Sequence, residues 1–528
     1  MTDFRPVSEE DVNRIISKLP NKSCSLDVIP TWLLKQCISP ILPPLTAIIN
    51  LSLISGKFPV SLKQAIVTPI IKKASLDLNQ LKKYRPVFNL KSFSKIMEKC
   101  AMSQLHKHMS DNELLDPYQS AYKPQHGTET ALLKVKNDIL CALDNRKAVF
   151  LILLDLSAAF DTVDFDIFDK RLTQCFGIHG NVKSWILSYL QDRTSQVCIA
   201  GHKSCEHALK FGVPQGSVVG PGMFTYYTYP LGRIIQSRNL KYHIYADDTQ
   251  IYIEFDPKIP GDTVVALHKL QECIKELRSW MTVNKLKLNE EKTEFFIAAS
   301  THNMNYLKNV SLNVCGTQIK PSNFVRNLGV YFDSNMTMSH HVSSLTRSLN
   351  FNLHNIGRIR RYIDEDTCNH TVRSLVLSRL DYSNSLLYGI TVKDMQKLQT
   401  IQNRSARLIF KANRREHTSP LLQQLHWLPV SERILFKILF LVFKARVGEA
   451  PRYLSELLSN YVPLENTRFL RSHADQYLLA YKRTYTSYGD KAFANSVPKL
   501  WNKLPITLRS ADKLRTFKSL LKTHLFAH

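Results

Sequence analysis

Three aspartates are spaced in a way that could support metal-dependent phosphate chemistry. Asp155 directly follows a mostly apolar run, residues 147–154, and the Asp247–Asp248 pair lies between two β-prone runs within residues 242–253. Carboxylates gathered in one place repel each other, and a divalent cation among them offsets that repulsion. Oxygen ligands favour Mg²⁺. Two such ions roughly 4 Å apart would activate a 3′-hydroxyl and stabilise a pyrophosphate leaving group.

The elements around the acids decide whether this chemistry is plausible, because an isolated Asp-Asp pair is usually a solvated turn. The run before Asp155 is short and apolar, which is typical of a strand buried on both faces. The runs that flank Ala246–Asp248 predict a hairpin with the acids at its tip. If these strands are neighbours in one sheet, they bring Asp155 beside that tip.

The other elements are predicted from the spacing of apolar residues and from the prolines that interrupt it. We expect helices with proline breaks over 8–56, starting at Ser8, a strand over 63–71, helices over 92–110 and 128–143, and an amphipathic helix from Leu267 to Met281. From about residue 341 the pattern is helical and basic. It includes a cluster of Arg358, Arg360 and Arg361, and a helix with Arg404, Arg407 and Lys411. The polar segment 463–480 predicts a linker.

The charge of the chain points to a polyanionic partner. The formal net charge is +26 over 528 residues, and residues 341–528 carry 30 Lys+Arg against 13 Asp+Glu. Such an excess favours nucleic acid over a protein that is merely soluble and basic. The N-terminus lacks the apolar segment of a signal peptide, and the longest apolar runs, 149–154 and 438–443, are too short to span a bilayer. We therefore expect an intracellular protein with no membrane partner.

Seven motifs in order resemble the reverse transcriptase of non-LTR (LINE-type) retrotransposons, and the similarity covers nearly the whole chain. They are Lys83-Tyr84-Arg85-Pro86, Gln119–Lys123 with Gly127-Thr128-Glu129, Leu154–Asp161, Gly212–Ser217, Tyr245-Ala246-Asp247-Asp248, Leu288-Asn289 with Lys292-Thr293-Glu294, and Asn327–Val330. The resemblance implies an α+β right-hand polymerase with fingers, a palm containing a small antiparallel sheet, and a helical thumb. The implied segments are a helical N-terminal extension over 1–60, fingers and palm over 61–335, a helical basic thumb-like region over 336–420, and a C-terminal region of unknown role over 421–528.

The resemblance also implies the metal ligands. Asp155 and Asp247 would bind two Mg²⁺ ions, for which Mn²⁺ could substitute, with the carbonyl of Leu156 as an extra ligand. Asp248 would be a supporting acid. Lys292 would protonate the pyrophosphate, although a surface lysine in a turn is an equally good interpretation.

The nucleotide would be held by residues of the other motifs. Arg85 and Lys123 would meet the triphosphate. Phe160 would exclude a 2′-hydroxyl, with an ordinary core Phe as the alternative. Gln215 and Gly216 would lie along the incoming nucleotide. The family usually has Arg where Lys123 stands, and lysine loses the bidentate fork. Gly222 replaces a large apolar residue and could loosen a helix.

The expected reaction is addition of dNMP to a DNA primer on an RNA template. Family members also carry an upstream endonuclease, which this sequence lacks, so an endonuclease would have to be supplied separately and the chain could be a truncated copy. Nuclear residence follows only from the family. Two alternatives remain open: an inactive remnant that only binds RNA, and a maturase-like splicing helper. We expect the basic region 341–420, including Arg404, Arg407 and Lys411, to grip the template–primer duplex.

Overall fold

The chain folds into two compact units, each assembled from three segments. The computed structural model describes residues 1–22, 24–72, 77, 79–157, 159–314, 316–462 and 477–527. Unit 1 comprises Met1–Tyr122, Asp155–Ile234 and Glu276–Asn289, and unit 2 comprises Lys123–Leu154, Ile235–Lys275 and Glu290–His528. The four-part division expected from the sequence stays a prediction. Of the predicted linker 463–480, residues 463–476 lie outside the described residues.

Unit 1 combines helices with a small mixed sheet of strand order β2-β1-β5-β6, in which β7 also pairs with β5. The helices are α1 (Glu9–Ser17), α2 (Thr31–Gln36), α3 (Ile38–Ser55), α4 (Ser92–Asp111), α6 (Phe165–Phe176), α7 (Gly180–Leu190) and α8 (Val219–Tyr227), with short turns η1 (Val60–Leu62), η2 (Leu81–Lys83) and η3 (Ala159–Thr162). The strands are β1 (Ala65–Ile71), β2 (Tyr84–Leu90), β5 (Arg193–Ile199), β6 (His202–Lys203) and β7 (His207–Leu209), and a separate pair is formed by β4 (Leu156–Ser157) and β10 (Lys287–Leu288). Helices α9 (Pro230–Ser237) and α10 (Asp262–Val283) each cross from one unit to the other.

The N-terminal helices follow the sequence pattern with one exception. Ser8 caps α1, as predicted, and its hydroxyl accepts a hydrogen bond from the backbone N–H of Asp11 at 3.2 Å. The predicted proline break is wrong at Pro43 and Pro44, because α3 continues through both residues.

Helix α3 is also the one described helix that is long and apolar enough, by length and composition alone, to cross a membrane. Core helices of soluble proteins pass the same test when they are mostly buried, whereas only 28% of this α3 window is buried, including Leu45, Ile49 and Leu53. The sequence analysis did not single out this segment, because serines, prolines and an asparagine interrupt its apolar residues.

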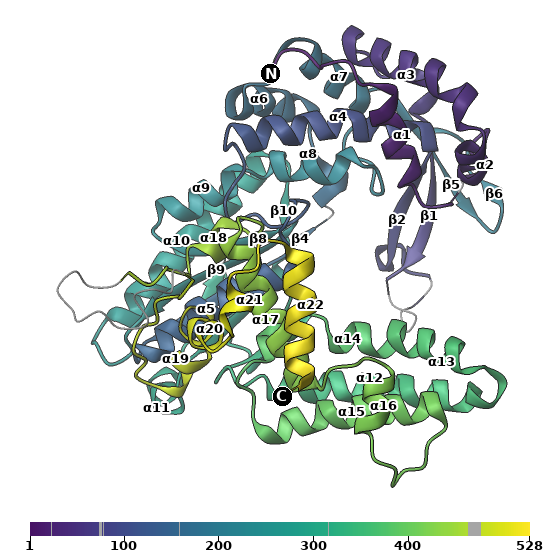
Figure 1. Ribbon diagram of the computed structural model, residues 1–528. Helices are drawn as coiled ribbons and strands as arrows, with labels where there is room; N and C mark the ends of the chain where they lie inside the picture. Colours follow the sequence, from purple (N-terminus) through teal and green to yellow (C-terminus); the bar gives the residue numbers. More distant parts are fainter. Residues whose placement is uncertain are drawn as a thin grey trace. The chain divides into compact units, whose positions relative to one another are not determined.

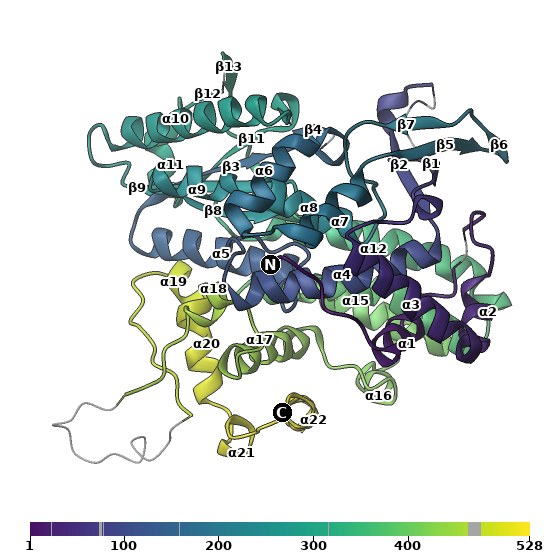
Figure 2. The same cartoon turned by 90° about the horizontal axis from the view of Figure 1, so that it is seen from above.

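Unit 2 is built on a four-stranded antiparallel sheet of order β11-β3-β9-β8. Its strands are β3 (Ala148–Leu154), β8 (Lys241–Tyr245), β9 (Asp248–Phe255) and β11 (Glu294–Ala298). Helix α5 (Thr128–Asp144) covers one face of this sheet and α10 runs along the other (Figure 2). Phe150 of β3 packs 4.1 Å from Phe255 and 5.3 Å from Phe295, measured between ring centroids. The apolar run before Asp155 is therefore a central strand, as predicted.

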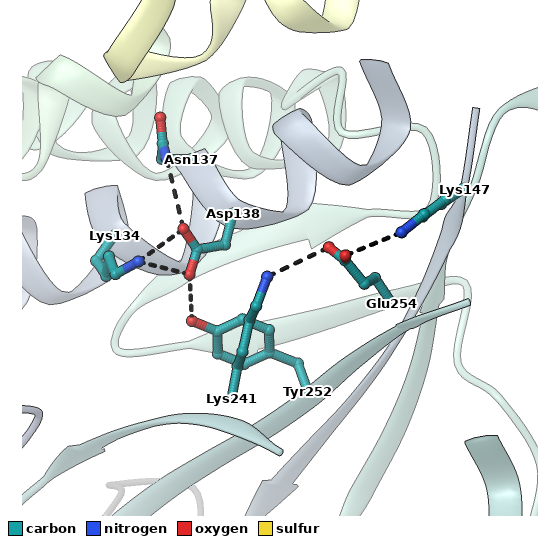
Figure 3. A network of polar contacts seen from close by, with 7 residues as sticks. All are labelled: Lys134, Asn137, Asp138, Lys147, Lys241, Tyr252 and Glu254. Carbon is teal, nitrogen blue, oxygen red and sulfur yellow. Dashed lines mark hydrogen bonds and ion pairs between the residues drawn. The ribbon is translucent and has the colours of Figure 1, made fainter. Parts of the chain in front are cut away.

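Polar contacts fasten α5 and the strand ends of this sheet together (Figure 3). The Asp138 carboxylate on α5 accepts hydrogen bonds from Lys134 at 2.8 Å and from the Tyr252 hydroxyl on β9 at 2.7 Å. Glu254 bridges two neighbouring strands, because it pairs with Lys147 at 3.1 Å and with Lys241 at 3.2 Å. These contacts tie the helix to the sheet at positions well away from the β8–β9 turn.

The remainder of unit 2 is mostly helical (Figure 1). It contains two small hairpins, β12 (Leu312–Val314) with β13 (Thr317–Ile319) and β14 (Phe324–Asn327) with β15 (Val330–Asp333). Its longer helices are α12 (Ser339–Ile359), α13 (Glu365–Val372), α15 (Val392–Phe410), α17 (Val430–Arg446), α20 (Phe493–Asn502) and α22 (Leu514–Ala527). Its short elements are η4 (Glu290–Lys292), α11 (Thr301–Met304), η5 (Asn305–Leu307), η6 (Arg360–Tyr362), the π-turn η7 (Arg373–Leu377), α14 (Ser378–Leu380), η8 (Asn384–Leu387), α16 (Ser419–Gln424), α18 (Arg452–Ser455), α19 (Ser487–Lys491) and α21 (Ile506–Arg509).

Arg360 is buried, although the sequence groups it with Arg358 and Arg361 in one basic cluster. Its side chain is buried, and its guanidinium donates to the carbonyls of Leu408 at 2.9 Å, Ile409 at 2.6 Å and Ile363 at 2.7 Å. Two of these carbonyls lie in the last turn of α15, where backbone acceptors lack partners within the helix. Arg360 is therefore a structural cation that satisfies a helix end.

Replacing Arg360 with Ala should destabilise unit 2 by about 3 kcal/mol, because one buried and two half-buried carbonyl acceptors lose their donor. Arg358 is exposed on the same segment, and Arg358→Ala should change the free energy of unfolding by less than about 0.5 kcal/mol. Urea unfolding followed by circular dichroism measures both variants. Equal midpoints for the two variants would contradict the structural role.

Candidate active site

The Asp247–Asp248 pair lies at a tight hairpin, as predicted. Tyr245 of β8 pairs with Asp248 of β9, so only Ala246 and Asp247 form the turn. Ala246 has φ of +58° and is buried, a conformation that is uncommon for a residue other than glycine. Such backbone strain is concentrated at functional sites. Asp247 is half-buried and Asp248 is exposed.

The register of the central sheet relates this hairpin to the strand that precedes Asp155. Leu154, the last residue of β3, pairs with Thr249 of β9. Strand β3 therefore ends at the same end of the sheet at which β9 begins with Asp248. Asp155 is the next residue along the chain from Leu154. Sequence analysis expected these two strands to be neighbours, and this part of the prediction is confirmed.

Within unit 1, Asp155 has a partner that the sequence analysis did not assign. The Asn289 side-chain amide donates to the Asp155 carboxylate at 3.1 Å, and the Asn289 backbone N–H donates to the Asp155 carbonyl at 2.9 Å. Strands β4 and β10 hold the two residues together, because Leu156 pairs with Leu288. The sequence placed Asn289 in a motif without giving it a role.

The acids have the chemistry that a magnesium site needs. Asp247 and Asp248 supply hard oxygen donors at an accessible tip, which fits Mg²⁺. Within the part of the chain that the structure describes, no group of three or more His, Cys, Asp or Glu side chains is gathered closely enough to hold a metal ion. The three-carboxylate cluster therefore stays a prediction.

Phe160 lies in η3 of unit 1 and is half-buried. Its ring stacks on Phe224 of α8, with centroids 4.8 Å apart and planes at 28°. Its carbonyl accepts a hydrogen bond from the backbone N–H of Val213 at 2.8 Å. Phe224 thus holds the Phe160 ring in place from one side. This packing fits both a ring that blocks a 2′-hydroxyl and an ordinary core residue.

The loop with Gln215 and Gly216 packs between η3 and β2. The Gln215 amide donates to both carboxylate oxygens of Asp161, at 3.1 and 3.2 Å. Burial raises the pKa of Asp161, while the Gln215 hydrogen bond and the charge of Lys72 oppose the rise. Gly216 has φ of +115°, and a Cβ there would lie 2.8 Å from the Phe88 carbonyl oxygen. Only glycine fits this close approach.

The predicted cations are distributed over both units. Arg85 is exposed on β2 in unit 1. In unit 2, Lys123 is half-buried in the turn before α5, and Lys292 is exposed in η4. On and after α15, Arg404 donates to the Asn350 side chain, Arg407 donates to the Glu416 carbonyl at 2.8 Å, and Lys411 ends the helix in the left-handed conformation.

Comparison with known proteins identifies the family to which residues 71–331 belong. Residues 71–331 match the family described as reverse transcriptase (RNA-dependent DNA polymerase). Residues 71–331 form a reverse transcriptase domain. This match confirms the predicted α+β fold class. The matched domain contains every predicted site residue except Arg404, Arg407 and Lys411.

Curated relatives support the predicted kind of reverse transcriptase. The chain is 25% identical over 412 residues to the RNA-directed DNA polymerase from mobile element jockey of Drosophila melanogaster, covering 76% of this chain and 44% of the relative. The jockey protein of Drosophila funebris is 24% identical, with 76% and 44% covered. The resemblance to non-LTR retrotransposon enzymes is thus confirmed. The chain spans less than half the length of these relatives.

One solved structure adds only a weak likeness. The structure of apo telomerase from Candida tropicalis matches with a TM-score of 0.39 and 12% identity, covering 74% of this chain and 68% of that chain. This similarity is too low to carry an argument.

Gly222 has a packing role within the reverse transcriptase domain. A Cβ at this position would lie 2.6 Å from the terminal methyl of Met102 on α4. Glycine therefore lets α8 approach α4 closely. The sequence suggested that Gly222 could loosen the helix, whereas in the structure its missing side chain leaves room for the Met102 side chain.

Glu98 is a buried carboxyl that the sequence analysis did not identify. It is fully buried on α4, and its carboxyl accepts hydrogen bonds from Ser94 Oγ at 2.7 Å and from the backbone N–H groups of Val218 and Val219 at 2.7 and 3.3 Å. These N–H groups begin α8, directly after the Gly212–Ser217 loop. Burial raises the pKa of Glu98 despite these donors. Glu98 therefore positions the loop that carries Gln215.

The raised pKa of Glu98 predicts a pH dependence of stability. A carboxyl whose pKa is raised on folding stabilises the fold below its ordinary pKa of 4.5, and this stability is lost as the pH rises through the folded-state pKa. Glu98→Gln cannot ionise, its oxygen can still accept from the N–H groups of Val218 and Val219, and its NH₂ can donate to Ser94 Oγ in place of accepting from it. Its stability relative to the wild type should therefore increase as the pH rises from 4.5.

Thermal unfolding of wild type and Glu98→Gln across pH 4.5 and above measures this difference. Glu98→Ala serves as the control, because it loses the hydrogen bonds and should be destabilised by about 2 kcal/mol or more throughout. A difference between wild type and Glu98→Gln that is constant with pH would contradict the assignment.

Proposed function

We propose that this chain is an RNA-directed DNA polymerase that adds dNMP to the 3′-end of a DNA primer on an RNA template and releases pyrophosphate. The pairing of Leu154 with Thr249 carries the proposal. Leu154 directly precedes Asp155 and Thr249 directly follows Asp248, so both of these neighbours lie at the same end of one sheet. The family of residues 71–331 supports this reaction class over others that use paired carboxylates.

The proposed roles of the acids follow from their donor atoms. Asp155 and Asp247 would hold two divalent cations, with the Leu156 carbonyl as a further ligand and Asp248 in support. Mg²⁺, for which Mn²⁺ could substitute, would supply Lewis acidity to the primer 3′-hydroxyl and to the leaving pyrophosphate. Asn289 orients the Asp155 carboxylate through its 3.1 Å hydrogen bond.

The nucleotide would be held by groups of fixed charge and shape. Arg85 and Lys123 would bind the triphosphate, and Lys292 would donate a proton to the departing pyrophosphate. The backbone of Gln215 and Gly216 would lie along the nucleotide, since its close packing against β2 fixes the loop.

Asp247→Asn should lower primer extension on an RNA template by at least about 10³-fold, because it removes a charged ligand of the proposed cations. Asp366 is exposed in the first turn of α13, so Asp366→Asn is a matched control with the same chemical change. Extension is measured with Mg²⁺ and with Mn²⁺, and RNA binding is measured on the same samples. If wild type and the Asp366→Asn control extend the primer no better than Asp247→Asn, all at background level and with RNA binding retained, the chain only binds RNA.

Phe160→Ala should lower the discrimination against ribonucleotides by about tenfold or more, because the ring then no longer blocks a 2′-hydroxyl. The readout is the ratio of kcat/KM for dNTP and rNTP in single-nucleotide extension. If Phe160 only fills the core beside Phe224, both values fall together and their ratio is unchanged.

A further inference from the structure

Helices α17 and α22, near the C-terminal end of unit 2, pack side by side (Figures 1 and 2). Their apolar faces meet through Phe443 and Phe517, whose rings stack with centroids 4.4 Å apart. Trp501 of α20 closes this small core at 5.8 Å from Phe517. Helices α17 and α22 are thus held in a fixed relation to each other.

Beside these stacked rings, the two helices carry lysines and phenylalanines that are half-buried or exposed. On α17, Phe436, Phe440 and Lys444 recur every four residues, and on α22 Lys518, Lys522 and Phe526 do the same, so each set shares a helix face. The Lys518 and Lys444 ammonium groups lie 4.6 and 5.5 Å from the Phe440 ring centroid. These six residues define the α17–α22 face.

A cavity of about 350 Å³ opens at one end of this face. Leu428 and Phe436 give it apolar walls, while His426 and Lys522 contribute polar groups. The Arg433 and Lys437 side chains also line it, and they are paired with Asp381 and Glu129 respectively. Its volume lies within the roughly 300–1,000 Å³ range of small-molecule sites.

Asn384 marks the polar end of the cavity. Its side chain is 5% exposed, and its Oδ1 has no hydrogen-bond partner among the described residues. Its Nδ2 makes one long hydrogen bond, 3.4 Å, to Asp381. An unsatisfied buried acceptor destabilises the fold. A planar ligand with an N–H at its edge could satisfy this oxygen if the Asn384 side chain turned towards the cavity that it lines.

We propose that the cavity binds one unstacked base of a single-stranded nucleic acid and that the α17–α22 face follows the flanking backbone. A base is flat and apolar on its faces, which suits Leu428 and Phe436, and it carries N–H donors at its edge, which suits Asn384 Oδ1. Exposed lysines beside aromatic rings are the combination that binds single strands. A duplex supplies an unstacked base only by losing its pairing and stacking, so it should bind more weakly. This binding is independent of the proposed polymerase chemistry.

The test compares charge-matched variants by fluorescence anisotropy. The probes are a labelled RNA of about twelve nucleotides, the DNA of the same sequence, and the RNA in a duplex. Lys518 and Lys522 are exposed, so Lys518→Gln/Lys522→Gln is expected to leave the fold intact. Lys258→Gln/Lys308→Gln removes the same charge from exposed turns elsewhere in unit 2 and is the control. Melting temperatures verify that both variants are folded.

The α17–α22 variant should bind the single strand about tenfold more weakly, and the slope of log affinity against log salt should fall by about 1.4, or 0.7 for each lost phosphate contact. Asn384→Leu should weaken single-strand binding without changing that slope. Arg404→Gln/Arg407→Gln should weaken duplex binding instead. Whichever single strand, RNA or DNA, loses more affinity in the α17–α22 variant is the strand that this face binds in preference.

Three results would overturn the proposal. The first is equal single-strand affinity of the α17–α22 variant and its control. The second is an equal loss of duplex and single-strand affinity in that variant. The third is unchanged single-strand affinity of Asn384→Leu. Primer extension by the α17–α22 variant on a short preformed duplex is expected to equal that of the wild type, so this test stands apart from the test of catalysis.

Discussion

The antiparallel pairing of β3 with β9 is the constraint on which the candidate active site depends. A slip of one residue would turn each buried side chain of a strand to the opposite face of the sheet. The register is fixed by packing, since Phe150 lies against Phe255 and Phe295, and by charge, since Glu254 holds Lys147 and Lys241. The sheet core, rather than the acids themselves, therefore determines which residues stand at the strand ends.

Local patterns predicted the elements that carry the chemistry, and they could not predict the contacts that hold these elements in place. The apolar run of β3 and the hairpin of β8 and β9 were recognisable from composition and alternation. Glu98 was not, because its backbone donors at Val218 and Val219 lie 120 and 121 residues away. Asn289 likewise reaches Asp155 across 134 residues. The residue pattern of one segment does not indicate which distant residue its side chains will contact.

The basic excess of the chain has two different physical roles. Some cations are structural: Arg360 satisfies the end of α15, and Lys136 is buried, donates to the Leu386 carbonyl, and has its pKa lowered to about 7 by burial. Others, such as Lys518 and Lys522, are exposed and available to phosphates. Net charge favours a nucleic-acid partner, and only the exposed cations among these residues are available to bind one.

Localised backbone cleavage by Fe²⁺ in place of Mg²⁺ tests the proposed carboxylate site most directly. Iron bound by side chains generates radicals, in the presence of ascorbate and peroxide, that cut the nearby chain, and mass spectrometry locates the cuts. Cuts are predicted beside both Asp155 and Asp247, with both sets lost in Asp247→Asn. Cuts confined to one of the two segments would contradict a metal site shared by the two strands.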